Sequence, residues 1–143
     1  MTESNAGSVL INRAFIFKAN MKTFKYFVGV QATYIFFTGI WPLIHIESFM
    51  AVTGPKTDVW LVKTVGALLI PVSLAMITHI FSNGNNRPLF VLGCFTALAF
   101  FCIDVYYVLA NVISEIYLAD ASVEFIFIVG WIFFVFRGGM LSK

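Results

Sequence analysis

Two acidic residues, Asp104 and Glu124, and one basic residue, Lys63, stand inside long apolar segments of the sequence. Carboxyl and amino groups in such surroundings can exchange protons or bind charged ligands. Turning one of them toward lipid costs about 2.5–3.5 kcal/mol on the insertion scale. We therefore expect all three side chains to face the interior of the protein, with Asp104 and Glu124 as the acid and base of any chemistry.

The positions of these three residues along their segments predict that they share a depth. With a helical rise of about 1.5 Å per residue, Lys63 lies roughly 7 Å from the nearer end of its segment. On the same reckoning Asp104 lies roughly 13 Å and Glu124 roughly 10 Å from an end on the same side. We expect them to meet in one pocket.

Helical spacing adds further residues to this pocket, because positions three, four and seven apart share a helix face. Asp104 shares its helix face with Tyr107 and Asn111, and Asp120 lies one turn before Glu124. The first apolar segment carries a polar stripe that begins at Gln31, and the second carries one that contains Lys63. Both stripes should face the axis of the bundle, where the predicted pocket lies. The ligand-binding residues predicted in this way are Lys63, His45, Trp41, Trp60, Tyr107, Asn111, Tyr117 and Asp120.

The charges of the predicted pocket do not balance, because one lysine faces two carboxylates. Either one carboxyl is protonated, or a cation occupies the site, or His45 supplies the missing positive charge. We expect Lys63 to pair with Asp104 and Glu124 to be the free acid, because Glu124 lies beneath the charge of Asp120. The alternative is a packing role, in which Lys63 and Asp104 form an interhelical ion pair and Glu124 bonds to Tyr107 or Thr64.

Composition shows which elements must position these residues. Hydrophobic residues make up 60% of the 143, whereas charged residues make up 11%, which is too few for a soluble surface. Four segments, 26–46, 59–81, 89–113 and 117–136, are long and apolar enough to span a bilayer as helices. Short connections predict an all-α, antiparallel four-helix bundle in the membrane. Residues 1–20 are expected to form an N-terminal extension or interfacial arm, and residues 21–143 a single domain.

Basic residues predict the orientation of this bundle. Lys18, Lys22 and Lys25 precede the first segment, Arg87 separates the second from the third, and Arg137 follows the fourth. The opposite side carries one basic residue, Lys56, together with Glu47, Asp58 and Glu115. The positive-inside rule then places both termini in the cytoplasm, as in a multi-pass protein of a bacterial inner membrane.

Other site chemistries find no support in the sequence. Neither His45 nor His79 has a partner at metal-ligand spacing, and common hydrolase and haem motifs are absent, so we predict no metal and no cofactor. The formal net charge of +2 does not indicate nucleic-acid binding.

Two stretches, "WPLIHIESFMAVTGPKTDVWLVKTVG" and "IDVYYVLANVISEIYLADASVE", carry a family resemblance. Their W-P-L-x-H, V-T-G-P-K and Y-L-x-D-A-x-x-E patterns resemble a family of small bacterial four-span proteins of uncharacterised activity. The size and layout are more loosely similar to DoxX-like proteins and to the EXPERA group of sterol isomerases and sigma-type ligand binders. The EXPERA resemblance implies that carboxylates within the bundle stabilise a cationic amine or carbocation, a part that Asp104 and Glu124 would take here.

Three functions are consistent with these observations. The first is a membrane protein whose polar pocket binds, or transforms, a small lipophilic or cationic molecule. The second is a proton- or ion-coupled carrier that uses the same residues as a relay. The third is an accessory subunit of a larger membrane complex, and a homo-oligomer is compatible with any of them.

Overall fold

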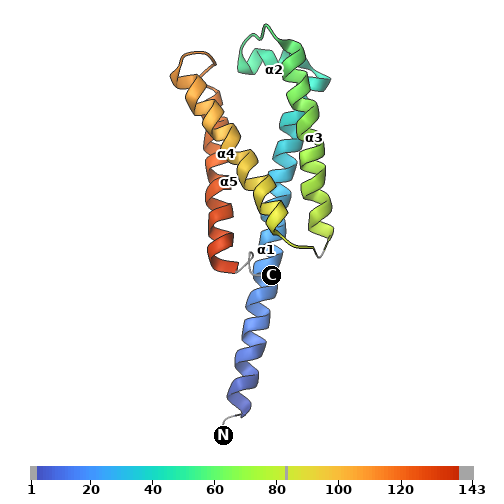
Figure 1. Cartoon of the computed structure of the whole chain (residues 1–143), viewed down its shortest axis with the longest axis vertical. Helices are drawn as coiled ribbons and strands as arrows, with labels where there is room; N and C mark the ends of the chain where they lie inside the picture. The colour runs from blue at the N-terminus through green and yellow to red at the C-terminus, as the bar shows by residue number, and fades with distance from the viewer. Residues whose placement is uncertain (1–2, 83, 139–143) are drawn as a thin grey trace.

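The computed structural model describes the backbone of residues 3–82 and 84–138, and the side chains of residues 21–82 and 84–136. Within these ranges the chain is all-α, as predicted (Figure 1). Its helices are α1 (Glu3–Ile44), α2 (Ile46–Thr53), α3 (Val59–Phe81), α4 (Arg87–Leu109) and α5 (Tyr117–Gly138).

Among the described residues, four helical segments are long and apolar enough to cross a membrane: Met21–Ile44, Val59–Phe81, Arg87–Leu109 and Tyr117–Phe136. They coincide with the four predicted segments apart from their ends. The chain is therefore a multi-pass membrane protein, and its outward faces carry exposed apolar side chains such as Phe81 and Phe136.

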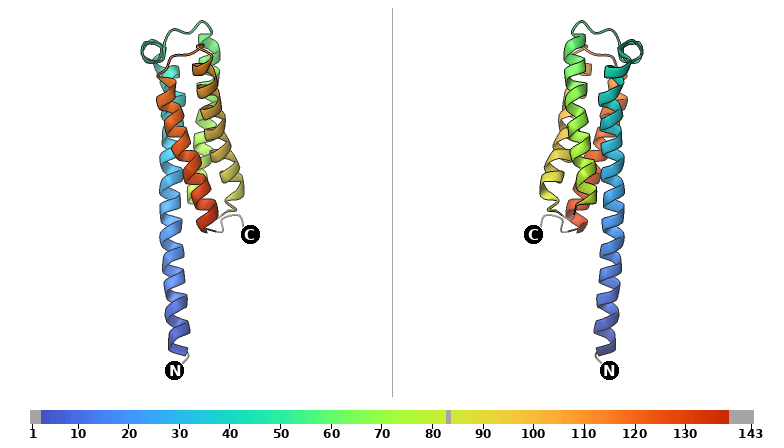
Figure 2. Two further views of the ribbon diagram at one scale, coloured as in Figure 1. Left: turned by 90° about the vertical axis from the view of Figure 1, so that its left-hand side faces the viewer. Right: turned by 90° about the vertical axis from the view of Figure 1, so that its right-hand side faces the viewer.

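Residues 3–20, which we expected to form an extension or arm, continue α1 without a break. This part of the helix projects beyond the ends of the other helices (Figures 1 and 2). We call the end of the bundle that carries α2 and the α4–α5 loop the α2 end. The opposite end, where α3 turns into α4, is the turn end.

The helices associate as two pairs, α1 with α3 and α4 with α5, and fewer residues connect one pair to the other. In Figure 1 the pairs lie closest at the turn end and diverge toward the α2 end. In the α1–α3 pair, a Cβ added to Gly66 would lie 2.5 Å from the carbonyl oxygen of Gly39, so only glycines permit this approach. The Ser73 hydroxyl also donates to the carbonyl of Ala32 at 2.7 Å.

Aromatic packing near the turn end joins the two pairs. The Trp131 ring on α5 lies 5.7 Å from Phe24 and 5.4 Å from Phe27 on α1, both edge to face. Gly93 on α4 and Gly130 on α5 leave room for these rings, because a Cβ on either would overlap Trp131 or Phe27. The core of the protein therefore sits in this half of the bundle.

The α4 helix ends at Leu109, four residues before the predicted end at Ile113. Asn111 follows with a φ of 56°, in the left-handed conformation that asparagine tolerates better than most residues. This turn lets the Val112 amide donate to the carbonyl of Tyr107 at 2.9 Å, which caps the helix. The sequence continues with apolar residues after Asn111, so the end of α4 at Leu109 could not be predicted from composition.

Candidate functional site

Asp104 on α4 and Glu124 on α5 lie on the packed faces of their helices, with only 4% and 2% of their surfaces exposed. On α4 the buried positions include Ala97 and Val108 on either side of Asp104, and on α5 they include Ala121 and Phe127 on either side of Glu124. Both carboxylates thus occupy helix turns where an apolar side chain would normally pack. We call them the acidic pair.

Asp104 lies closer to the α2 end than the sequence predicted, whereas the depth of Glu124 is unchanged. Because α4 ends at Leu109, Asp104 is roughly 8 Å from the end of its helix rather than 13 Å. Glu124 is roughly 10 Å from the start of α5. The shared depth of the two carboxylates is therefore preserved, and Asp104 and Asp120 both lie near enough for their charges to act on Glu124.

Neither member of the acidic pair has a hydrogen-bond partner among the described residues. Oδ2 of Asp104 and Oε2 of Glu124 are fully buried and accept no hydrogen bond. In the same part of the chain no cation lies within ion-pair distance of either carboxylate. A buried carboxylate without a partner is costly in free energy, and binding a proton or a cation would lower that cost.

Lys63 does not supply that cation, and its predicted inward position was wrong. It lies on the exposed face of α3 together with Trp60, Thr64 and Ala67. The opposite face, which includes Gly66, packs against α1, because the small residues there allow the closest approach. Lys63 is roughly 6 Å from the start of α3, so its long side chain can reach the membrane surface from a lipid-facing position.

The packing alternative is not what the structure shows either. Lys63 and Asp104 form no ion pair, and Glu124 is bonded to neither Tyr107 nor Thr64. The Thr64 hydroxyl instead donates to the carbonyl of Trp60 within its own helix, at 2.9 Å.

His45 and Trp41, which we predicted to line the pocket, hold the short helix α2 instead. The Nδ1 atom of His45 accepts from the Ser48 amide at 3.1 Å and caps the start of α2. The Trp41 indole donates to the Ser48 hydroxyl at 2.9 Å, and its ring packs edge to face on Phe49. A helix as short as α2, between the predicted segments 26–46 and 59–81, has no clear signal in the sequence, so these partners could not be predicted.

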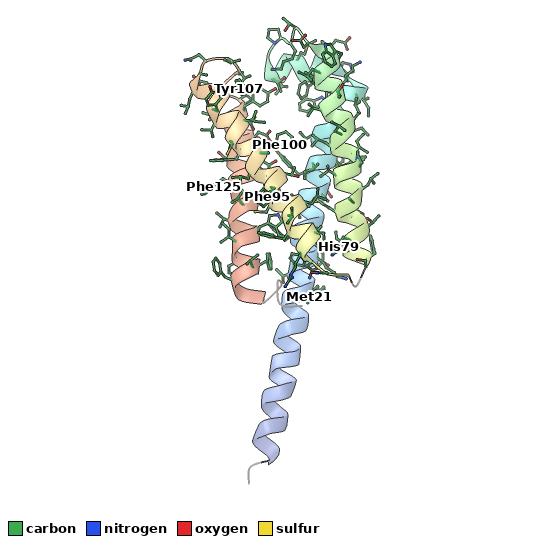
Figure 3. All side chains as sticks on the ribbon, viewed as in Figure 1. Met21, His79, Phe95, Phe100, Tyr107 and Phe125 are labelled. Atoms are coloured by element: carbon green, nitrogen blue, oxygen red, sulfur yellow. The ribbon has the colours of Figure 1, made fainter. Side chains whose placement is uncertain are left out.

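The remaining predicted residues divide between the rim of the site and its surroundings. Asp120 is half-buried, one turn above Glu124, whereas Tyr107 is 41% exposed at the upper end of α4 (Figure 3). Asn111 caps α4 and is exposed. Tyr117 meets the ammonium of Lys56, which lies 4.9 Å from its ring centroid and joins the loop after α2 to the start of α5.

A second buried polar cluster was only partly foreseen from the sequence. The Gln31 side chain on α1 donates to the carbonyl of Gly93 on α4 at 2.9 Å and accepts from the Trp131 indole on α5 at 2.8 Å. One amide therefore links three helices, and every polar atom involved is satisfied. Its signal in the sequence was a lone glutamine in an apolar segment, which marks burial but not the identity of its partners.

No cluster of three or more His, Cys, Asp or Glu side chains able to hold a metal ion occurs among the residues that the structure describes. No protein-family model, curated protein or solved structure matches this chain. Two buried carboxylates on adjacent helices can bind a cationic group between them, or pass a proton.

Proposed function

We propose that this membrane protein binds a small lipophilic molecule bearing a positive charge, such as a protonated amine, at the acidic pair. The observation that carries the proposal is that Asp104 and Glu124 are each more than nine-tenths buried and accept no hydrogen bond at Oδ2 and Oε2. A group with one positive charge would compensate one carboxylate, with the other carboxyl protonated, and its apolar remainder would suit the surrounding membrane helices. The resemblance to EXPERA proteins supports the same chemistry.

Thermal unfolding of the purified protein in a neutral detergent tests this proposal. A lipophilic tertiary amine should raise the unfolding midpoint, and a neutral alcohol with the same apolar group should not. At 100 times its Kd, a ligand that binds only the folded state stabilises it by about 2.7 kcal/mol.

Two variants and a control make this test specific. The stabilisation should disappear in Asp104→Asn and in Glu124→Gln and persist in Asp58→Asn, because Asp58 is exposed before α3 and makes no side-chain cap. Equal stabilisation by the neutral alcohol, or its survival in the combined Asp104→Asn/Glu124→Gln variant, would contradict the proposal.

A proton- or ion-coupled carrier is the second candidate function, because a buried carboxyl without a fixed counter-charge can also exchange a proton. Proton flux into liposomes that contain the protein distinguishes the two. A flux that Glu124→Gln abolishes, with no stabilisation by the amine, would favour the carrier.

We further propose that both termini face the cytoplasm of a bacterial inner membrane. Support comes from the charges at the two ends of the bundle. Three basic residues with described side chains, Lys22, Lys25 and Arg87, lie at the turn end without an acidic residue beside them. At the α2 end, Lys56 and Lys63 are accompanied by the acids Glu47, Asp58 and Glu115.

A further inference from the structure

A cavity at the turn end combines a basic group with apolar walls. Its volume is about 300 Å³, within the range of small-molecule sites. It lies between α1, the end of α3 and the start of α4, and Figure 3 shows two of its residues, Met21 and His79, at that end. Its lining residues are Met21, Phe24, Lys25, Val28, His79, Ile80, Ser82, Gly84, Asn86 and Leu89.

The polar part of the lining favours an anion. Lys25 is half-buried, and its ammonium has no hydrogen-bond or ion-pair partner in the described part of the chain. No acidic residue is among the described lining residues. The carbonyl oxygen of His79, at the end of α3, already accepts from the amide and hydroxyl of Ser82, at 3.0 and 3.1 Å. The free ammonium therefore sets the charge of the cavity.

The other lining residues make the cavity suitable for a group that also carries apolar chains. Phe24, Val28 and Leu89 are buried core residues that form its deeper wall. The ring of His79 is held by a contact of 3.1 Å between Nε2 and Oδ1 of Asn86, so this side of the wall is ordered. The cavity opens where the spanning segments end, which is the level of lipid headgroups in a bilayer.

We infer that this cavity is a binding site for the phosphate headgroup of an anionic phospholipid, held by Lys25. Basic pockets between helices at the membrane surface bind lipid headgroups in this way. The site is separate from the acidic pair, because Leu89 and Asp104 stand roughly 22 Å apart along α4. It therefore does not depend on the proposed function.

Native mass spectrometry of the protein in a neutral detergent, titrated with short-chain phosphatidylglycerol, tests the inference. We expect one lipid to bind more tightly than phosphatidylcholine of the same chain length. Lys25→Gln should weaken this binding roughly fivefold to tenfold, the effect of one lysine at a membrane surface.

Lys22→Gln is the matched control, because it removes the same charge three residues earlier on α1. Lys22 is exposed, and its ammonium lies 6.0 Å from the ring centroid of Tyr26 rather than in the cavity. It should change binding less than twofold. An equal loss in both lysine variants, or equal binding of phosphatidylcholine, would overturn the inference.

Inorganic phosphate separates a lipid site from a site for a soluble anion. At the same concentration it should not displace phosphatidylglycerol, because it gains nothing from the apolar wall. Displacement would overturn the assignment to a lipid. His79→Gln, which alters the wall and leaves Lys25 in place, should weaken lipid binding less than Lys25→Gln, and the reverse order would contradict the role given to the lysine.

Discussion

The acidic pair differs in one respect from the other buried polar residues that the structure describes. Gln31, Thr53 and Ser73 each make hydrogen bonds, whereas Asp104 and Glu124 make none. A group that is buried for stability is normally satisfied, because leaving it unpaired costs free energy. The unsatisfied carboxylates of the acidic pair are therefore the observation that supports our proposal of a ligand or proton site there.

This difference predicts that Glu124→Gln and Asp104→Asn do not destabilise the ligand-free protein. The amides lose no hydrogen bond, and each substitution removes a charge that repels its neighbours. We expect unfolding free energies equal to or above that of the wild type, measured by denaturant unfolding in detergent. A loss of about 3 kcal/mol or more in either variant would indicate a structural ion pair and contradict this account.

Gln31→Met should behave in the opposite way. It keeps the volume of the side chain and leaves the Trp131 indole and the Gly93 carbonyl without their partner. Hydrogen bonds between membrane helices contribute about 0.6 kcal/mol on average and up to about 1.7, so we expect a loss of roughly 1–3 kcal/mol for the two. Thr33→Val is the control, because the exposed Thr33 hydroxyl bonds only to Gly29 of its own helix, and it should change stability little. Equal losses of stability in Gln31→Met and Thr33→Val would show that the hydrogen bonds between helices do not stabilise the protein more than one within a helix.

At the level of single residues, the sequence predicted the burial of Asp104 and Glu124 but misplaced Lys63. Short carboxylate side chains deep in a helix cannot reach water, so their burial follows from depth alone. A lysine near a helix end can extend to the surface from any face. Which face packs is then decided by neighbours such as Gly66, and the long polar side chain does not report it.

Among the helices, contact between α1 and α3 depends on Gly39 and Gly66. A Cβ on Gly66 would lie 2.5 Å from the Gly39 carbonyl oxygen, so Gly66→Ala should force the helices apart and cost about 1–3 kcal/mol. The matched change Ala67→Val adds volume at the next residue, which is exposed, and should cost less than about 0.5 kcal/mol. Thermal unfolding of both variants in detergent makes the comparison. Tolerance of Gly66→Ala would mean that the two helices are not as close as this structure has them.

The end of α4 offers a second test at the scale of an element. Asn111 has a φ of 56°, so Asn111→Gly should preserve or slightly raise stability, because glycine adopts this conformation freely. Asn111→Val should lower it by about 1–2 kcal/mol, since a branched side chain is strained there. If both substitutions lowered ligand-dependent stabilisation without lowering stability, Asn111 would be a ligand contact, as the sequence suggested, rather than a cap.

For the whole molecule, apolar length predicted the four spans and the all-α class, since backbone groups in lipid must be satisfied within a helix. The pairing of α1 with α3 and of α4 with α5, and their separation toward the α2 end, could not be predicted in the same way. That arrangement depends on which small residues meet which rings, as Gly93 meets Trp131. Composition along one helix does not contain this information.

The orientation of the molecule in the membrane gives the last prediction. With Cys94 and Cys102 replaced by alanine, Thr57→Cys and Asn85→Cys place one exposed thiol at each end of the bundle. Lys22, Lys25 and Arg87 gather at the end that carries Asn85, and basic residues are retained on the cytoplasmic side. A membrane-impermeant maleimide added to intact cells should therefore label Thr57→Cys at once and Asn85→Cys only after the membrane is permeabilised. The reverse order would invert the protein and place the cavity at Lys25 on the outer surface. Equal labelling in intact cells would mean that the α3 helix between the two positions does not cross the membrane.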